Sequence, residues 1–189
     1  MRLIKIIIPC LLLGACVFGT SKTSKFYTQS AIVTEIIAPD YTAFIGINRV
    51  QLPKYMERPQ MVTQLKDSQQ ISISEYNRWV EYPSVLATRV LTENLGVLLP
   101  AAQVKQNQFK GEKFDKTVSV EIMKLTAVLG EQAELEAWYT IKNKTGKNTI
   151  YQKFETVIPI GKTYDELAQG YNELFAALSR EIATALSKK

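Results

Sequence analysis

Strict alternation of apolar and polar residues along positions 133–141 sets the strongest limit on the fold of this chain. Ala, Leu, Ala, Tyr and Ile occupy every second position, with Glu, Glu, Trp and Thr between them. A period of two is typical of an antiparallel strand with one buried and one solvated face. Similar apolar positions recur in residues 118–122 and 150–158, and turns are indicated at Gly130 and at residues 143–147. The pattern predicts a three-stranded meander whose apolar face needs a cover.

Two amphipathic segments are predicted to supply that cover. In residues 84–99, Ser84 can cap a helix whose apolar residues recur at helical spacing. Residues 163–186 open with a capping box, in which Thr163 and Glu166 each satisfy a free backbone N–H. A long apolar stripe follows the box. We expect both helices to pack on the sheet, and the alternative for the second one is an amphipathic helix on a membrane.

Short strands are predicted at residues 25–30, 43–52, 61–66 and 71–74, where β-branched and aromatic residues lie between turn signals. The lysine-rich residues 106–116 are most simply a solvated loop. The predicted fold class is therefore α/β, of the two-layer α+β kind. It has a mixed, largely antiparallel sheet with a C-terminal three-stranded meander, covered by two main helices.

The absence of histidine from all 189 residues excludes several kinds of catalytic site. Ser-His-Asp and Cys-His nucleophiles, histidine-ligated zinc and imidazole proton shuttles all need that side chain. The two cysteines, Cys10 and Cys16, both lie near the N-terminus, which leaves the body without a disulfide or a thiolate metal site. We expect no catalytic residue, no metal and no cofactor. No nucleic-acid partner is expected either, because clustered cations with aromatics facing one way are missing.

The first fifteen residues are predicted to be a signal peptide. Arg2 and Lys5 form a positive region, and an apolar run at 6–13 follows. At about 1.5 Å per helical residue, this run is too short to cross a hydrocarbon core of about 30 Å. A charged start before a short apolar run is typical of a secretory signal. The alternative is a buried N-terminal helix.

The end of this leader indicates lipid attachment. Leu13-Gly14-Ala15-Cys16 resembles the bacterial lipobox, in which a peptidase cuts before the cysteine and the thiol takes the lipid. We therefore expect cleavage between Ala15 and Cys16 and lipid attachment at Cys16, with a free thiol as the alternative. Lipoproteins of this kind resemble triacylated molecules, with chains such as palmitate, and more than one acyl chain makes anchoring stable.

The expected mature chain has a short tether and one domain. Loss of the leader leaves 21 basic and 18 acidic residues, a net charge of +3. Residues 16–24 are mostly small and polar and suit a lipidated tether, and 25–189 form a single periplasmic domain. In the usual bacterial sorting pattern, Asp after the cysteine retains a lipoprotein at the inner membrane. Val17 and Phe18 stand there instead, which indicates anchoring in the outer membrane.

Three further stretches give the chain a resemblance to a known family. They are QLPKYMERPQMVT at 51–63, NRWVEYPSVLATRVLTENLGVLLP at 77–100 and TYDELAQGYNELFAALSREIATAL at 163–186. With the lipobox, and in this order, they resemble the ABC-type transport auxiliary lipoproteins, the PqiC/YmbA-like family of membrane integrity-associated transporter subunits. Many relatives continue Trp-Ala-Glu-Pro-Leu where residues 79–83 read Trp-Val-Glu-Tyr-Pro, so the proline before the first helix is displaced by one position.

The resemblance implies a periplasmic α/β body on the outer membrane that acts as an auxiliary subunit and not as an enzyme. Its partners would be an MCE-domain periplasmic protein and an inner-membrane transporter subunit that move lipids between the membranes, and the body could form a homo-oligomer. A lipid anchor would raise its effective concentration for a partner reaching across the periplasm.

Five residues are candidates for a docking surface: Tyr55, Arg58, Arg78, Trp79 and Trp138. Aromatic and guanidinium groups are enriched at interface hot spots. The alternative for Tyr55 and Trp79 is that they fill the core beside the first helix. Trp138 is in phase with glutamates on the solvated face of its strand, where a neighbouring strand could shield it.

Two other functions remain open from the sequence. A lipoprotein subunit of another envelope machine, for outer-membrane protein or lipopolysaccharide assembly, would need the same anchor and a similar body. A cell-wall hydrolase could use two carboxylates without histidine, for example Glu75 and Glu81. Nothing in the sequence places such a pair across a cleft.

Overall fold

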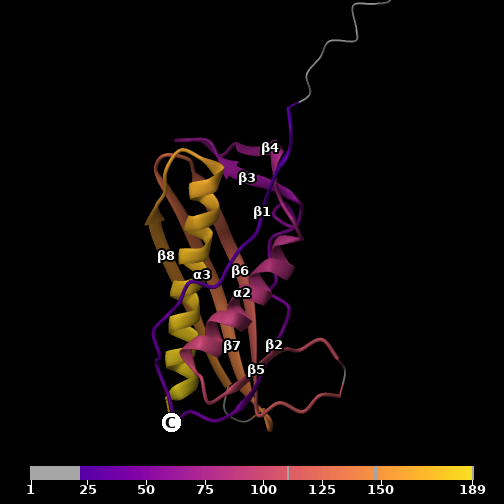
Figure 1. Cartoon of the computed structure of the whole chain (residues 1–189), viewed down its shortest axis with the longest axis vertical. Coiled ribbons are helices and arrows are strands. Elements are labelled where there is room, and N and C mark those ends of the chain that lie inside the picture. The colour runs from indigo at the N-terminus through magenta and orange to yellow at the C-terminus, as the bar shows by residue number, and fades with distance from the viewer. Residues whose placement is uncertain (1–21, 110, 147–148, 189) are drawn as a thin grey trace, which may run out of the picture.

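The computed structural model describes residues 22–109, 111–146 and 149–188. The expected signal peptide, its cleavage site and Cys16 lie outside these residues. The described chain forms the predicted two-layer α+β fold, and Figure 1 shows two helices running side by side over the strands. In chain order the elements are β1 (Lys25–Tyr27), β2 (Phe44–Ile47), β3 (Gln60–Gln64), β4 (Ile71–Trp79), α2 (Pro83–Leu98), β5 (Gln103–Gln106), β6 (Lys116–Val128), β7 (Gln132–Asn143), β8 (Thr149–Pro159) and α3 (Tyr164–Ser187).

A five-stranded sheet forms one layer, in the order β5-β2-β6-β7-β8. Strands β6, β7 and β8 pair antiparallel, which confirms the predicted meander, and β2 lies parallel to both β5 and β6. The β6 strand is longer than the predicted 118–122, because a register shift between Ile122 and Lys124 interrupts its alternation. Strand β5 is absent from the sequence prediction.

A second, three-stranded sheet in the order β1-β4-β3 lies at one end of the molecule (Figure 1). β1 pairs parallel with the end of β4, and β3 pairs antiparallel with β4 around the predicted polar turn. The prediction of a strand at 71–74 is too short, since β4 continues through Trp79. Only a single mixed sheet was expected, and the separation into two sheets depends on pairings between segments far apart in the chain.

The helices cover one face of the five-stranded sheet (Figure 1). The apolar positions of β7 that alternate from Ala133 to Ile141 are all buried, as predicted. The α3 capping box is confirmed: the Thr163 side chain accepts from the Glu166 backbone, and the Glu166 carboxylate accepts from the Thr163 backbone. The faces of α2 and α3 that meet carry a buried polar pair, in which Asn94 Nδ2 donates to Ser179 Oγ at 3.2 Å.

The predicted cap of the first helix is wrong in detail. Tyr82 is the N-cap of α2, without a side-chain hydrogen bond, and proline at the following position starts the helix. A proline there costs nothing, because its missing N–H would have no partner in the helix. The Ser84 hydroxyl instead accepts from Arg49 and donates to Glu57 at 2.5 Å. Ser84 therefore ties the helix to the loops beside it.

Residues 28–43, here called the crossing segment, lie on the outer side of the helices (Figure 1). The segment leaves β1, passes over α3 and α2, and returns to β2 at the opposite end of the sheet. The backbone N–H of Ile37 donates to the carbonyl of Leu98 at 2.9 Å, and Val33 is buried. The crossing segment thus adds a covering to the helical layer that the sequence analysis does not predict.

Candidate docking surfaces

Trp79 lies in the core, with 3% of its surface exposed. Its indole stacks on Tyr171 of α3, with ring centroids 5.8 Å apart and planes inclined by 19°. Burial raises the pKa of the Tyr171 hydroxyl, with a smaller contribution from the charge of Tyr55. The expectation that Trp79 contributes to a docking surface is therefore corrected, because a partner cannot reach a side chain this deeply buried. The alternative given for it, core packing, describes its position.

Trp138 lies on the solvated face of the five-stranded sheet, as its phase predicts. It is half-buried, since Tyr151 on β8 stacks against it with centroids 4.6 Å apart and planes only 7° from parallel. The Tyr151 ring is itself 65% exposed. A neighbouring strand thus shields part of Trp138 and at the same time enlarges the aromatic surface that the face presents.

Polar groups border this aromatic pair, here called the aromatic stack. A shallow hollow of about 290 Å³ separates it from Arg49 and from the polar residues that follow β2. Ion pairs cross the rest of the face, Lys124 to Glu134 at 2.7 Å and Lys153 to Glu136 at 2.9 Å. An aromatic centre with a charged, solvated rim is the arrangement found at protein interfaces.

Tyr55 and Arg58 lie in the irregular stretch between β2 and β3. Tyr55 is half-buried against the core, and burial raises the pKa of its hydroxyl, partly offset by the nearby charge of Lys124. The Arg58 guanidinium is partly covered, and its Nε has no hydrogen-bond partner within the described residues. Both side chains are therefore only partly accessible to a partner.

Arg78 lies on β4, opposite Phe26 of β1 and Gln60 of β3. It is half-buried, and its Nε also lacks a hydrogen-bond partner in the part of the chain that the structure describes. Neither Arg58 nor Arg78 forms an ion pair among the described residues. Two guanidinium charges near the three-stranded sheet thus remain without a carboxylate partner there. The structure does not bring the five predicted residues together on one surface.

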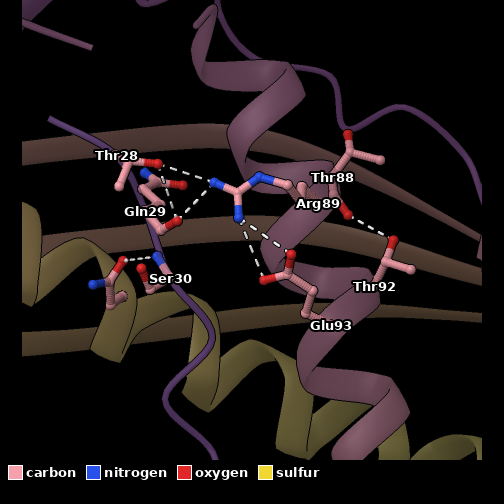
Figure 2. Close-up of polar contacts among 8 residues, drawn as sticks. Thr28, Gln29, Ser30, Thr88, Arg89, Thr92 and Glu93 are labelled. Atoms are coloured by element: carbon pink, nitrogen blue, oxygen red, sulfur yellow. Dashed lines mark hydrogen bonds and ion pairs between the residues drawn. The ribbon is translucent and has the colours of Figure 1, made fainter. Parts of the chain in front are cut away.

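The crossing segment is fixed by an arginine of α2. Figure 2 shows Arg89 reaching from the helix, where its Nη2 donates to the Gln29 carbonyl at 2.7 Å and to the Thr28 hydroxyl at 3.0 Å. The other guanidinium nitrogen, Nη1, pairs with Glu93 one turn along α2 at 3.2 Å. Because Gln29 is buried, its carbonyl needs a partner from the protein, and Arg89 supplies it.

Contacts to α3 hold the other side of the same segment. The backbone N–H of Ser30 donates to Asn172 Oδ1 at 3.0 Å, and Arg180 pairs with Glu35. The hydrogen bond from Arg180 lowers the pKa of the exposed Glu35 carboxyl to about 2. Contacts from both helices therefore position the crossing segment, and no sequence motif indicated them.

A larger hollow lies at the end of the sheet opposite to β1, β3 and β4. It measures about 630 Å³ and is lined by Phe114, Lys113, Lys142 and Lys144 together with polar loop residues. Beside it, Phe109 is 74% exposed in the segment predicted to be a solvated loop. Phe114 departs from that prediction, since it is buried over Gly46 and lies against Phe44 with centroids 4.6 Å apart.

Metal binding and membrane crossing have no candidates among the described residues. They contain no group of three or more Cys, Asp or Glu side chains arranged to hold a metal ion. Within the same residues, no helix has both the length and the apolar character needed to cross a bilayer. The features that remain are surfaces, namely the aromatic stack, the three-stranded sheet and the lysine-lined hollow.

Known proteins share this fold. A crystal structure of an uncharacterized protein superposes with a TM-score of 0.72 at 20% identity, covering 88% of this chain and all of the other. A protein from Xanthomonas campestris, assigned to the family DUF330, superposes with a TM-score of 0.68 at 8% identity, covering 84% of this chain and 92% of the other. At these identities the similarity shows the fold alone. No curated protein matches the chain by sequence.

A match to a protein family is more specific. Residues 28–183 match the family described as ABC-type transport auxiliary lipoprotein component. The match spans the crossing segment, the five-stranded sheet, β3 and β4 of the other sheet, and most of α3. The chain belongs to this family, and the resemblance found in its sequence is thereby confirmed. The family is one of auxiliary lipoprotein components of ABC-type transport.

Proposed function

We propose that this protein is a lipoprotein anchored by Cys16 in the outer membrane, which docks the periplasmic part of an intermembrane lipid transporter. The family match over residues 28–183 is the observation that carries the proposal. The lipobox at residues 13–16 supports the anchor, and Val17 and Phe18 after the cysteine support the outer membrane. The partners would be an MCE-domain protein and, through it, the inner-membrane transporter subunit.

The protein contributes a binding surface and no chemistry of its own. For this surface we propose the uncovered face of the five-stranded sheet, centred on Trp138 and Tyr151. Rigid aromatic rings lose little conformational entropy on binding and bury a large area, which suits them to anchor an interface. The bordering Arg49, whose side chain is 63% exposed, adds a guanidinium group of the kind enriched at hot spots.

Affinity capture from mild detergent tests this function. The lipidated wild type should retain a membrane-anchored MCE-domain protein, and the double variant Trp138→Ala, Tyr151→Ala should retain at least about tenfold less, equivalent to roughly 1.4 kcal/mol. Phe109→Ala is the matched control, because Phe109 is an exposed aromatic outside this face. It should capture the partner as well as the wild type does.

Three results would contradict the proposal. Absence of any MCE-domain protein in wild-type captures would remove the assigned partner, and capture of a β-barrel protein instead would favour an envelope assembly machine. Equal losses in the double variant and the control would remove the aromatic stack from the interface. Self-association belongs to the same proposal, and the mass of the captured complex measures it.

A further inference from the structure

Exposed apolar side chains gather on the three-stranded sheet and its flanks. Half of the large apolar residues that are exposed in the described chain lie there: Phe26, Leu65, Ile71, Ile73, Tyr76, Val80 and Tyr82. A soluble domain leaves such side chains scattered singly, and a concentration of them marks a contact surface. The part of this group nearest the start of the described chain is Phe26, Tyr76, Val80 and Tyr82, which we call the tether patch.

The backbone holds the tether patch together. Phe26 lies opposite Arg78 in the register of β1 and β4, and the Val80 N–H donates to the carbonyl of Tyr27 at 2.8 Å. The Lys22 ammonium lies 5.8 Å from the centre of the Tyr76 ring, a cation–π distance. The first described residue therefore touches the patch, and the chain enters the fold beside it (Figure 1).

The length of the tether limits how far the patch can lie from a bilayer. Lys22 stands six positions after Cys16 in the chain. Even when fully extended this stretch spans only about 20 Å. The opposite end of the five-stranded sheet is farther from Cys16 by the length of β6. This strand has 13 residues and spans about 40 Å. With lipid on Cys16, the three-stranded sheet is thus the part of the fold closest to the membrane.

The chemistry of the patch fits the headgroup region of a phospholipid bilayer. Tyrosine rings combine an apolar body with a polar tip and are enriched at that depth. Lys22, Lys25 and Arg78 supply cations, against the anions Glu75 and Glu81, a nearly balanced charge. Contact should therefore depend mainly on apolar and aromatic insertion and only weakly on lipid charge.

We propose that the tether patch inserts its side chains into the interfacial region of the anchoring membrane and so fixes the orientation of the protein. This inference rests on the lipid anchor of the proposed function and assigns a second point of membrane contact. With two contacts the long axis of the sheet points away from the membrane, and the lysine-lined hollow and Phe109 lie at the remote end.

Single-cysteine labelling of the full lipidated chain tests the orientation. The body contains no cysteine after Cys16, which the lipid blocks, so Phe26→Cys and Tyr82→Cys each give one reactive thiol. Phe109→Cys is the matched control on an exposed aromatic at the opposite end. Each variant receives a nitrobenzoxadiazole label and is reconstituted in vesicles of phosphatidylethanolamine and phosphatidylglycerol. Vesicle flotation, quenching by headgroup spin-labelled lipid and quenching by aqueous iodide are then measured.

The expected result is co-flotation of all three variants, with lipid quenching at least twofold greater at positions 26 and 82 than at 109. Flotation with no lipid quenching and full iodide access at 26 and 82 would overturn the inference while leaving the anchor intact. Flotation with shielding from both quenchers would also overturn it, since a second copy of the chain would then cover the patch. Absence of flotation would overturn both the anchor and the orientation.

Discussion

Trp79 of β4 stacks on Tyr171 of α3, with ring centroids 5.8 Å apart. The contact joins the three-stranded sheet to the helix that covers the five-stranded sheet. Both rings are buried, so the pair links the two parts of the fold through the core. Trp79 follows Arg78, and an aromatic residue beside an arginine suggests a docking surface. The stack on Tyr171 places Trp79 in the core instead.

Trp79→Ala should lower the free energy of unfolding by about 3–5 kcal/mol, the usual cost of truncating a buried large aromatic. Chemical denaturation monitored by circular dichroism measures the change. Tyr151→Ala is the control, because its ring is largely exposed, and it should cost less than about 1 kcal/mol. Equal midpoints for Trp79→Ala and the wild type would contradict the core assignment.

Arg89→Ala should loosen the crossing segment without unfolding the helices. The change removes the charge-assisted hydrogen bonds to Gln29 and Thr28 and leaves the buried Gln29 carbonyl with only a long hydrogen bond of 3.4 Å from the Thr28 hydroxyl, which costs about 1–2 kcal/mol. Hydrogen exchange of residues 28–38 should become roughly tenfold faster. Arg49→Ala removes a partly exposed arginine that contacts Ser84 and Glu57 instead, and it should leave exchange in the segment unchanged. Unaltered exchange in Arg89→Ala would contradict the prediction, because other contacts would then hold the crossing segment in place without Arg89.

The ion pair of Glu35 with Arg180 predicts a specific acid sensitivity. The hydrogen bond from Arg180, with smaller contributions from the backbone N–H groups of Glu35 and Thr34, holds the pKa of the folded Glu35 carboxyl at about 2, below its ordinary value of 4.5. A lowered folded pKa stabilises the protein above pH 4.5, and this stabilisation is lost as the pH falls toward 2. Denaturation at several pH values should show wild type more stable than Glu35→Gln at pH 7, with the difference vanishing near pH 2. In an Arg180→Gln background the effect of Glu35→Gln should become smaller, because only the backbone hydrogen bonds of Thr34 and Glu35 still favour the carboxylate, and an undiminished difference there would contradict the assignment.

Gly46→Ala should destabilise the protein because the added methyl group meets the buried Phe114 ring. A Cβ at this position would lie 2.5 Å from the nearest ring carbon, too close for an unshifted contact. Overpacking of this kind costs about 1–3 kcal/mol. Gly96→Ala is the matched control, since a Cβ there meets nothing within 4 Å on α2, and it should stabilise by about 0.4–1 kcal/mol. Equal unfolding midpoints for Gly46→Ala and the wild type would show that Phe114 moves freely.

Local patterns predicted the parts of the fold that local physics determines. The alternation from Ala133 to Ile141 required a buried face, and the capping box at Thr163 and Glu166 fixed the start of α3. The separation into two sheets has no local signal, because β1 pairs with a strand some fifty residues later. The same holds for the crossing segment, whose position depends on Arg89 and on α3.

For the candidate surfaces too, the sequence predicts what local pattern determines and misses what long-range packing determines. Strand phase placed Trp138 on the solvated face, but only the register with β8 shows that Tyr151 covers part of it. For Trp79 the sequence left both core and surface open, because burial there depends on where α3 packs. The tether patch was not predicted, since Phe26 and Val80 come near one another only through the pairing of β1 with the end of β4.

Mass spectrometry of the mature N-terminus, combined with membrane fractionation, tests whether a lipid on Cys16 anchors the protein. We expect a chain that begins at Cys16, carries acyl chains on that residue and sediments with the outer membrane. Cys16→Ser should remove the lipid and release the folded body from the membrane, with an unchanged circular dichroism spectrum as the control. A wild-type chain that retains Met1 and an unmodified Cys16 in the soluble cell fraction would contradict lipid anchoring at Cys16.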